Sequence, residues 1–443
     1  MKWIQQLLAS AEARKGMLLG IGMIAAGAFD YAVNVLAGRW LQPVQYGIFV
    51  SIMAILQVML LLSIAIRMVV AFYTADLAAR ETTTSQVGPF VRRAWRWSWK
   101  WGIAGTVLMI AAGPLLARYL WLPNSWAVWA ASFMVLMLFV RETVYGTMQG
   151  TLEFTGLGLA QVLQAFLRLV FAGVLIALGW KAPGAIVAQP LACAVALLLV
   201  MPWMRPVLRM PDAPLQRKVS WRYSFNTLTG LAAFGLLTNL DAIFVKRFYS
   251  PESAGDYAPV VTLAKISLFL PWAIGIVLFP KVAHRQASGR DPRPILWMSL
   301  AAAMAPGLAL SALYFAYPQL LVSRIFANGY HDPGIVLGLA SLAATLYAGL
   351  NIWLNYALSL GRQSFSYVLL GLVPFQVAMM AAFGRDNLVN MTVAMAVSGM
   401  IGNIAGLAAT WSSSPATAPA TETAVVCTGA LEPVGAEALP PGR

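Results

Sequence analysis

The chain has 443 residues, of which 60% are hydrophobic and only 10% are charged, and its mean hydropathy is +0.73. Soluble domains carry about 25% charged residues, so this composition excludes a soluble globular protein. Long continuous apolar runs predict an all-α polytopic membrane protein. They exclude a transmembrane β-barrel, whose strands alternate polar and apolar residues in segments of about ten.

The net charge of +14 does not indicate nucleic-acid binding, because Lys and Arg gather in the cytoplasmic loops of membrane proteins. The two cysteines, Cys193 and Cys427, are too few for a disulfide framework or a metal cluster. No zinc-protease, nucleotide-binding or dinucleotide motif occurs in the sequence. We therefore expect no cofactor, no metal site and no catalytic residue.

Twelve apolar segments are long enough to span a bilayer. The first is too long for the apolar part of a signal peptide and contains Asp30 and Asn34, so we expect it to be retained. Lys and Arg number 19 in the loops on the side of the N-terminus and seven in the opposite loops, which predicts both termini in the cytoplasm. The segments are 17–37, 47–70, 98–117, 126–147, 157–179, 184–204, 222–244, 258–280, 295–317, 335–358, 364–384 and 388–410.

A polar stretch at 205–221 divides these segments into six and six. It predicts an N-terminal lobe over 1–204 and a C-terminal lobe over 222–410, with 205–221 as a cytoplasmic loop between them. The tail over 411–443 is rich in Ala, Pro, Thr and Ser, so it cannot bury a core and we expect it to be disordered.

A short pattern occurs twice, about 208 residues apart. The sequence RWLQP at 39–43 precedes an apolar segment that holds Arg67, and RFYSP at 247–251 precedes one that holds Lys265. This is a candidate internal repeat. Both halves would start on the same side of the membrane, so we expect parallel lobes around a central cavity that binds the substrate.

Three cations lie inside predicted helices: Arg67, Arg168 and Lys265. A charge at the centre of a membrane helix costs about 2.5–3.5 kcal/mol on insertion scales, so it requires a partner, water or a function. Arg67 lies near the end of its segment, where snorkelling to the interface explains it as well as cavity lining does. For Arg168 and Lys265 we favour cavity lining; Asn239 and Asp241 could pair with Lys265 or with the cations of the next loop.

Asp30 and Asn34 share a face of the first helix. Interhelical hydrogen bonding and ion coupling both explain them, and the cost of an intramembrane carboxylate favours ion coupling. Gln161 and Gln164 form one polar stripe with Arg168, which we expect to line the cavity.

Asn351 and Asn355 follow Tyr347 at steps of four residues, and for this stripe interhelical bonding and cavity lining are equally good explanations. Arg141 and Glu142 are sequence neighbours near the end of a predicted helix, so we expect them to point apart and to be interfacial. The remaining internal cations then outnumber the internal acid, Asp30, three to one. Such a cavity favours a large anion, and phosphate or pyrophosphate suits arginine in particular.

Three stretches resemble the polysaccharide-transport branch of the multidrug/oligosaccharidyl-lipid/polysaccharide exporter superfamily. They are LQPVQYGIF at 41–49, QAFLRLVFAGVLIALGWKAPGA at 164–185 and the stretch from LTNLDAIF to LFPKVA at 237–283. The resemblance covers roughly 15–410. It implies twelve helices in two six-helix lobes and alternating access in a bacterial or archaeal cytoplasmic membrane. It also implies a polyprenyl-pyrophosphate-linked oligosaccharide as substrate, moved from the inner to the outer leaflet.

The resemblance also suggests roles for individual residues. Cationic positions in the cavities of such flippases suggest substrate contacts for Arg67, Arg168 and Lys265, and the acidic position in the first helix suggests ion coupling for Asp30. We expect the lipid-linked substrate and membrane lipids as partners, and no nucleic acid. A polysaccharide polymerase or a chain-length regulator is a further partner to be tested.

Two other functions compete with the flippase hypothesis. An ion-coupled small-molecule antiporter of the multidrug type would share the fold, but cation extrusion favours internal carboxylates, and one acid against three cations argues against it. A glycosyltransferase, polymerase or ligase would need acids in the first outer loop or a long outer loop, and neither occurs. We therefore expect a transporter and not an enzyme.

Overall fold

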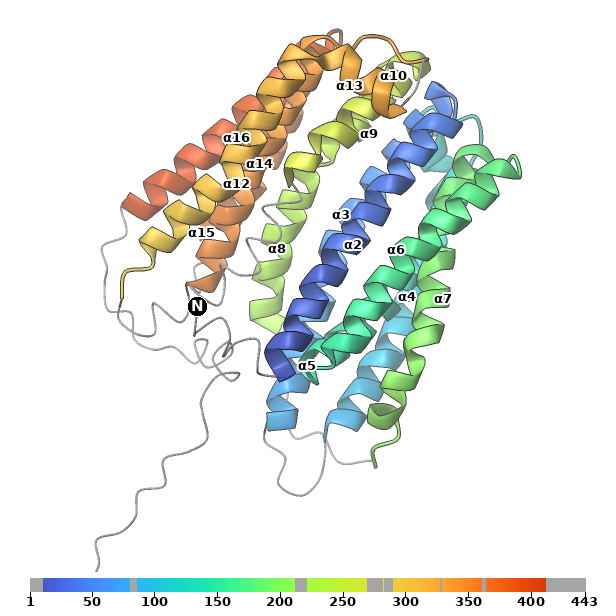
Figure 1. The fold of residues 1–443 in the computed structure, drawn as a ribbon, viewed down its shortest axis with the longest axis vertical. Coiled ribbons are helices and arrows are strands. Elements are labelled where there is room, and N and C mark those ends of the chain that lie inside the picture. Colours follow the sequence, from blue (N-terminus) through green and yellow to red (C-terminus); the bar gives the residue numbers. More distant parts are fainter. Residues whose placement is uncertain are drawn as a thin grey trace, which may run out of the picture.

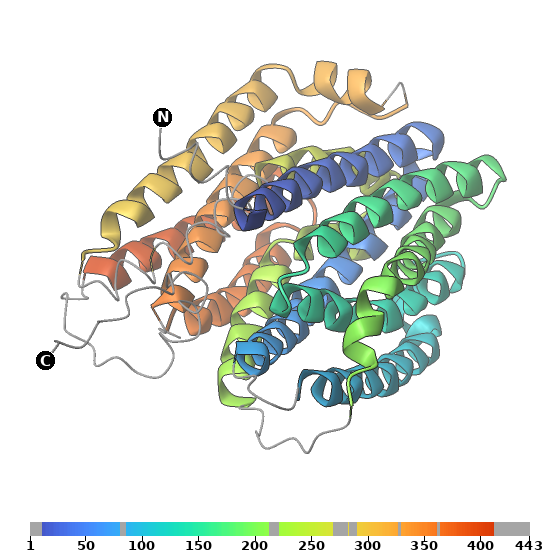
Figure 2. The same ribbon diagram turned by 60° about the horizontal axis from the view of Figure 1, so that its bottom comes forward.

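The structure is a computed structural model, and it describes residues 11–79, 86–211, 221–268, 282, 290–326, 329–360 and 364–411. Every regular element in these ranges is a helix, so the predicted all-α class is confirmed. Figures 1 and 2 show two lobes, one made by the blue-to-green helices and the other by the yellow-to-red helices.

The first lobe contains six long helices, one for each of the first six predicted segments. They are α2 (Ala11–Trp40), α3 (Pro43–Ala79), α4 (Val87–Tyr119), α5 (Trp126–Gly150), α6 (Phe154–Ala177) and α7 (Lys181–Leu208). The second lobe contains α8 (Trp221–Leu237), α9 (Leu240–Phe248), α10 (Pro251–Ala264), α12 (Arg293–Ala316), α13 (Pro318–Phe326), α14 (Ile335–Ser359), α15 (Ser364–Phe383) and α16 (Leu388–Trp411).

Nine helices in the described residues are long and apolar enough to cross a membrane, or ten when α8 and α9 are counted as one bent span. The chain is therefore a multi-pass membrane protein. The number of twelve is not confirmed and stays a prediction, as do the lobe boundaries at 204 and 222. The tail over 412–443 and most of the predicted segment at 258–280, from 269 onward, lie outside the described residues.

The predicted continuous helix at 222–244 is wrong: α8 and α9 are separate helices bent by 45° at a break over Thr238 and Asn239. The reason is local. The Thr238 hydroxyl donates to the Phe234 carbonyl at 2.9 Å and the Asn239 amide to the Gly235 carbonyl at 2.8 Å, and such side-chain bonds compete with the helix ladder.

A second break falls at Lys265. The sequence predicted Lys265 well inside a continuous helix. In the structure α10 ends at Ala264, and Lys265 is the C-cap residue, with its N–H bonded to the carbonyls of the last turn. Both breaks lie in the C-terminal lobe, so this lobe has two discontinuities that the apolar sequence does not reveal.

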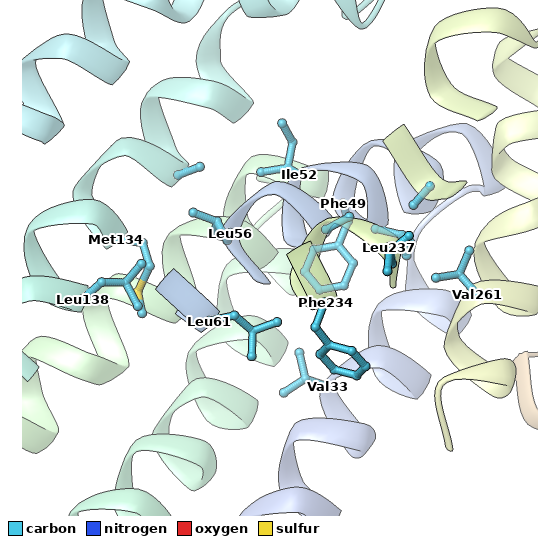
Figure 3. Close-up of a cluster of buried hydrophobic side chains, with 14 of the residues drawn as sticks. Val33, Phe49, Ile52, Leu56, Leu61, Met134, Leu138, Phe234, Leu237 and Val261 are labelled. Atoms are coloured by element: carbon cyan, nitrogen blue, oxygen red, sulfur yellow. The ribbon is translucent and has the colours of Figure 1, made fainter. Parts of the chain in front are cut away.

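Helix α3 joins the two lobes. It packs against α5 of its own lobe and against α8, α9 and α10 of the other. Figure 3 shows buried side chains at this junction, among them Phe49 and Leu61 of α3, Phe234 of α8 and Met134 of α5. Lipid tails are as apolar as leucine, so close van der Waals packing of such side chains holds the lobes in place.

The end of the molecule that carries α13 contains the last turn of α2 and the first turns of α3 and α10, and we call it the α13 end (Figure 1). The predicted orientation places the α13 end outside the cytoplasm. That orientation rests on the charge distribution alone and stays a prediction.

Candidate functional site

The first polar site joins Asp30 of α2 to Arg168 of α6, a pair that we call the Asp30–Arg168 pair. Arg168 Nη1 donates to Asp30 Oδ1 at 2.7 Å, and the side chains are 10% and 46% exposed respectively. Arg168 Nη2 also contacts the Met53 sulfur at 3.5 Å. The buried Nε has no hydrogen-bond partner among the described residues, and an unpaired buried donor is a place for water or a ligand.

Asn34 does not contribute its side chain to this pair. Its amide Nδ2 donates to the backbone carbonyl of Asp30 at 2.9 Å. The two residues share a face of α2 as expected, but Asn34 serves the helix backbone in this structure.

The second polar site, which we call the N-lobe ion cluster, comprises Arg67 of α3 with Arg141, Glu142 and Tyr145 of α5. Glu142 is fully buried and accepts from Arg67 Nε at 2.5 Å and from Arg141 Nε at 2.9 Å. Both guanidinium groups lie over the Tyr145 ring, 5.4 and 5.6 Å from its centroid, within the range of cation–π attraction. The Tyr145 hydroxyl donates to Gln164 of α6 at 3.1 Å.

The expectation that Arg141 and Glu142 are interfacial and point apart is wrong. Both are buried, and Arg141 folds back onto its own neighbour. The cause is the packing of α5, which contacts α3, α4 and α7 and leaves these charges no route to water. The carboxylate lies between two arginines, so each of the three ions has a partner of opposite charge. Any one of them buried alone would be an uncompensated charge.

The third polar site lies where the two helix breaks of the C-terminal lobe meet, and we call it the helix-break site. Lys265 Nζ donates to Asn239 Oδ1 at 2.7 Å, and the Tyr257 hydroxyl donates to Asp241 Oδ2 at 3.2 Å. Asp241 is buried, and its Oδ1 has no hydrogen-bond partner among the described residues. Discontinuous helices near the middle of a membrane are where transporters commonly bind substrates and ions.

The remaining predicted residues behave differently from one another. Tyr347 of α14 donates to Gln376 of α15 at 2.9 Å and so joins two helices. Asn355 donates to the side chain and the carbonyl of Asn351, at 3.0 and 2.8 Å, within α14. Gln161 is partly buried on α6.

The structure therefore brings Asp30 together with Arg168, and Gln164 together with Arg67 through Tyr145. Within the described part of the chain, no hydrogen bond or ion pair links Lys265 to either arginine. The three predicted cations thus occupy three separate sites. The same residues show no group of three or more His, Cys, Asp or Glu side chains that could hold a metal ion.

The expected ratio of three internal cations to one acid is also wrong. Arg141 and Lys246 are two further buried cations, and Glu142 and Asp241 are buried acids in addition to Asp30. The sequence did indicate that Glu142 has a partner or a function, because an acid five residues inside an apolar segment carries a high free-energy cost in the membrane. Its two partners could not be read from the sequence, since Arg67 comes from another helix.

Residues 35–334 match the family described as polysaccharide biosynthesis protein. The chain belongs to this family. Membership agrees with the resemblance found in the sequence, and the match includes Arg67, Arg168, Lys265 and both copies of the repeated motif from Arg39 onward. A search of curated proteins found no match.

Solved structures show which fold this polysaccharide biosynthesis protein has. It is similar to the inward-facing conformation of a multidrug resistance MATE family transporter of the MOP superfamily, with 13% identity over 87% of this chain and 96% of that one and a TM-score of 0.68. A MATE structure in complex with MaD3S gives 14% identity, 91% and 97% coverage and a TM-score of 0.65.

A third similar structure is a MOP superfamily transporter from Pyrococcus furiosus whose binding pocket is described as having reverse polarity. It gives 16% identity over 91% of this chain and 97% of that one, with a TM-score of 0.57. These likenesses establish the two-lobed MATE fold. The chain thus has the fold of these membrane transporters.

Proposed function

We propose that this protein is a flippase that moves a polyprenyl-pyrophosphate-linked oligosaccharide from the inner to the outer leaflet of the cytoplasmic membrane. The observation that carries the proposal is a polysaccharide biosynthesis family match in a chain with a transporter fold. A polysaccharide pathway that assembles its glycan on a lipid inside the cell needs a carrier to bring that lipid across.

The chemistry of the interior supports a pyrophosphate ligand. Arginine presents several N–H groups in a planar fork that matches phosphate oxygens. Arg168 has a buried Nε without a partner among the described residues, and the Arg67 side chain is one-quarter exposed although it is paired with Glu142. Each arginine therefore has donors to offer an anion. Gln161, Gln164, Lys265, Asn351 and Asn355 would supply further contacts, to the glycan or to phosphate.

The Asp30–Arg168 pair supports a simple form of ion coupling. While Asp30 is charged, it competes with the substrate for Arg168 Nη1. A proton or a cation on Asp30 would release Arg168 to the pyrophosphate, and Asn34 lies one turn away to help hold the cation. Because Asp30 is nearly half exposed, an ion can reach it without the helices separating.

A deletion strain tests the proposal. Without the protein, a complete lipid-linked repeat unit should accumulate while surface polysaccharide is lost, and mass spectrometry of extracted lipids would show both and identify the glycan. The double variant R168Q/K265Q should fail to restore export, whereas R118Q, at an exposed position in the last turn of α4, should restore it. Normal surface glycan without accumulation would contradict the flippase function, and an incomplete repeat unit would indicate a missing enzyme instead.

A small-molecule antiporter is the second candidate, and one observation favours it. Asp241 is a buried carboxylate whose Oδ1 has no hydrogen-bond partner among the described residues. A cationic drug or a coupling ion requires a group of this kind. This function predicts that the deletion strain becomes sensitive to lipophilic cations while its surface glycan stays normal. The lipid analysis and a drug-susceptibility panel on the same strain separate the two candidates.

A further inference from the structure

The repeated motif has a structural counterpart at the α13 end. Arg39 and Arg247 lie 208 residues apart, as do Pro43 and Pro251, and the structure adds a third equivalent pair, Gly47 and Gly255. The full repeat is therefore Arg-aromatic-x-x-Pro-x-x-x-Gly, at the end of the first helix of each lobe and the start of the second.

Arg39 reaches from the N-terminal lobe to the C-terminal lobe. Its Nε donates to the Ile325 carbonyl at 2.7 Å and its Nη2 to the Arg324 carbonyl at 2.8 Å. Both acceptors lie in the last turn of α13, where free carbonyls and the helix dipole attract a cation. Beside it, the Tyr330 hydroxyl donates to the Gly38 carbonyl at 2.6 Å.

Arg247 reaches in the opposite direction, from the C-terminal lobe to the N-terminal lobe. Its guanidinium lies 5.1 Å from the Tyr119 ring centroid and 5.3 Å from that of Trp121, a cation–π geometry. Trp121 has a φ of 52°, a left-handed conformation that is unfavourable for a bulky residue. The turn after α4 thus holds a strained backbone while it presents this ring to Arg247.

The two arginines make reciprocal contacts. Arg39 binds the segment after the third predicted span of the C-terminal lobe, and Arg247 binds the segment after the third predicted span of the N-terminal lobe. Two parallel repeats that are related by one axis place each arginine against the equivalent segment of the other lobe. The contacts also differ in chemistry, since one arginine binds carbonyls and the other binds aromatic rings.

The repeated glycines lie between the two arginines, where α3 and α10 cross. A Cβ on Gly47 would lie 2.9 Å from the Ala254 carbonyl oxygen, and one on Gly255 would lie 2.5 Å from the Pro43 carbonyl. The backbones therefore touch, and only glycine permits it. Just below, the Tyr46 and Thr262 hydroxyls share a hydrogen bond of 2.7 Å across the lobes.

We propose that the repeated motif is a two-part clasp that closes the α13 end, in which Arg39 and Arg247 each hold the opposite lobe and the Gly47–Gly255 crossing is the contact that they keep together. The contacts of both arginines with the opposite lobe must break before this end can open. The inference rests on the proposed transport function only in assuming that the end opens. It is independent of the substrate.

The clasp is tested by a distance measurement on purified protein without substrate. With Cys193 and Cys427 replaced, spin labels at Asn124 and Asp386, two exposed positions of the α13 end in opposite lobes, report the separation by pulsed electron resonance. We expect one short-distance population in the parent. In R39A/R247A we expect the ratio of long to short distances to rise about tenfold, the equivalent of two such contacts, with each single variant giving part of the change.

Two matched variants sharpen the test. R118A removes an exposed arginine from the same end and should leave the distances unchanged. R247K should keep much of the closure, because an ammonium group also binds aromatic faces, whereas R39K should lose more, because lysine cannot span two carbonyls. Unchanged distances in R39A/R247A would overturn the clasp, even in a protein that flips glycolipid normally. A flippase defect with opened distances would support it.

A different observation concerns the outside of the N-terminal lobe. A groove of about 670 Å³ runs between α5 and α7, and its lining is almost entirely apolar. Aromatic side chains form its walls, among them Trp126, Phe133 and Trp180, and small residues such as Ala130 and Ala194 are also in its lining. Trp129 is fixed there by a hydrogen bond of 3.2 Å from its indole to the Ile110 carbonyl.

The dimensions of the groove match one lipid chain. Both helices start at the α13 end, and the lining extends from Trp126 to Met137 on α5. Eleven residues of helix rise about 17 Å, close to the half-thickness of a hydrocarbon core of about 30 Å. Lys181, an exposed cation at the start of α7, directly follows Trp180 of the groove lining, and an anionic headgroup would be attracted to it.

We infer that this groove binds an acyl chain of an anionic phospholipid of the leaflet at the α13 end, with the headgroup against Lys181. The test uses nanodiscs of equal parts phosphatidylglycerol and phosphatidylcholine that contain a photoactivatable phosphatidylglycerol. Crosslinks should map to α5 and α7. They should fall at least fivefold in A194F, which fills the groove, and in F133A, which removes a wall, and K181A should abolish the preference for phosphatidylglycerol.

Controls come from other membrane-facing positions. A301F and F383A change exposed residues of α12 and α15 and should leave the α5 and α7 crosslinks unchanged. Crosslinks spread evenly over all helices, or unaffected by A194F and F133A, would overturn the site. Displacement of the phospholipid by polyprenyl phosphate would overturn it too, because the groove would then belong to the substrate.

Discussion

Glu142 is the residue on which the N-lobe ion cluster depends. It is the counterion that Arg141, which is buried, and Arg67, which is one-quarter exposed, share. Replacing it with glutamine keeps the volume and leaves both guanidinium groups without a counterion. Removing one partner of a buried ion pair costs about 3–5 kcal/mol, so E142Q should lower the Tm of the purified protein in detergent by many degrees.

The comparison for this prediction is E153Q. Glu153 precedes α6, and its side chain forms no cap there, so this variant should melt with the parent. The double variant E142Q/R67Q should recover part of the loss, because it also removes one orphaned charge. Equal melting of E142Q and E153Q would show that the cluster is not a stabilising ion pair.

Asp30 gives a prediction about ligand binding. In D30N the pair with Arg168 loses its charge, and Arg168 becomes free to bind an anion. We expect affinity for a short-chain polyprenyl pyrophosphate to rise by about tenfold, in line with an ionic hydrogen bond of 1.5–3 kcal/mol, and to lose its dependence on the coupling ion. Titration calorimetry on D30N and on N34A would show it. Weaker binding in D30N would mean that Asp30 supports the ligand and does not compete with it.

At the level of elements, the sequence predicted where helices lie far better than where they break. Hydrophobic periodicity locates a segment such as 222–244, but the break at Thr238–Asn239 depends on two side chains turning back onto carbonyls. The same limit applies to the site. Arg168 and Lys265 were found because a charge in an apolar run is costly, and Asn239 was already a candidate partner of Lys265, which the structure confirms. The pairing of Arg168 with Asp30 depends on tertiary packing that no periodicity encodes.

The α3–α10 crossing gives a prediction at the same scale. G255A places a methyl group against the Pro43 backbone, which cannot yield as a side chain would. Overpacking of this kind costs about 1–3 kcal/mol. G27A is the matched variant, because a Cβ at Gly27 in α2 meets nothing within 4 Å and helix propensity alone favours alanine by about 0.5–1 kcal/mol. Thermal unfolding in detergent should therefore shift in opposite directions for the two.

At the scale of the whole molecule, the two-lobed architecture followed from the repeat and from the polar stretch at 205–221. Both are properties of the linear sequence, so they can be recognised without knowledge of how the helices pack. The contacts of Arg39 and Arg247 explain why the repeat is visible at all, because each copy of the motif holds the opposite lobe, although through different chemistry. The balance of charge inside the protein could not be predicted in this way, because Arg141 and Glu142 look interfacial until α5 is surrounded by its neighbours.

The orientation of the molecule is the last prediction. The excess of Lys and Arg on the side of the N-terminus places the α13 end outside the cell. In a variant without Cys193 and Cys427, a cysteine at Asn124 should react in intact cells with a maleimide that cannot cross the membrane. A cysteine at Arg209, just after α7, should react only after permeabilisation. The reverse pattern would invert the molecule and place the clasp on the cytoplasmic side. The clasp would then close the end from which a glycolipid made inside the cell has to be loaded, which is incompatible with a resting state ready for outward transport.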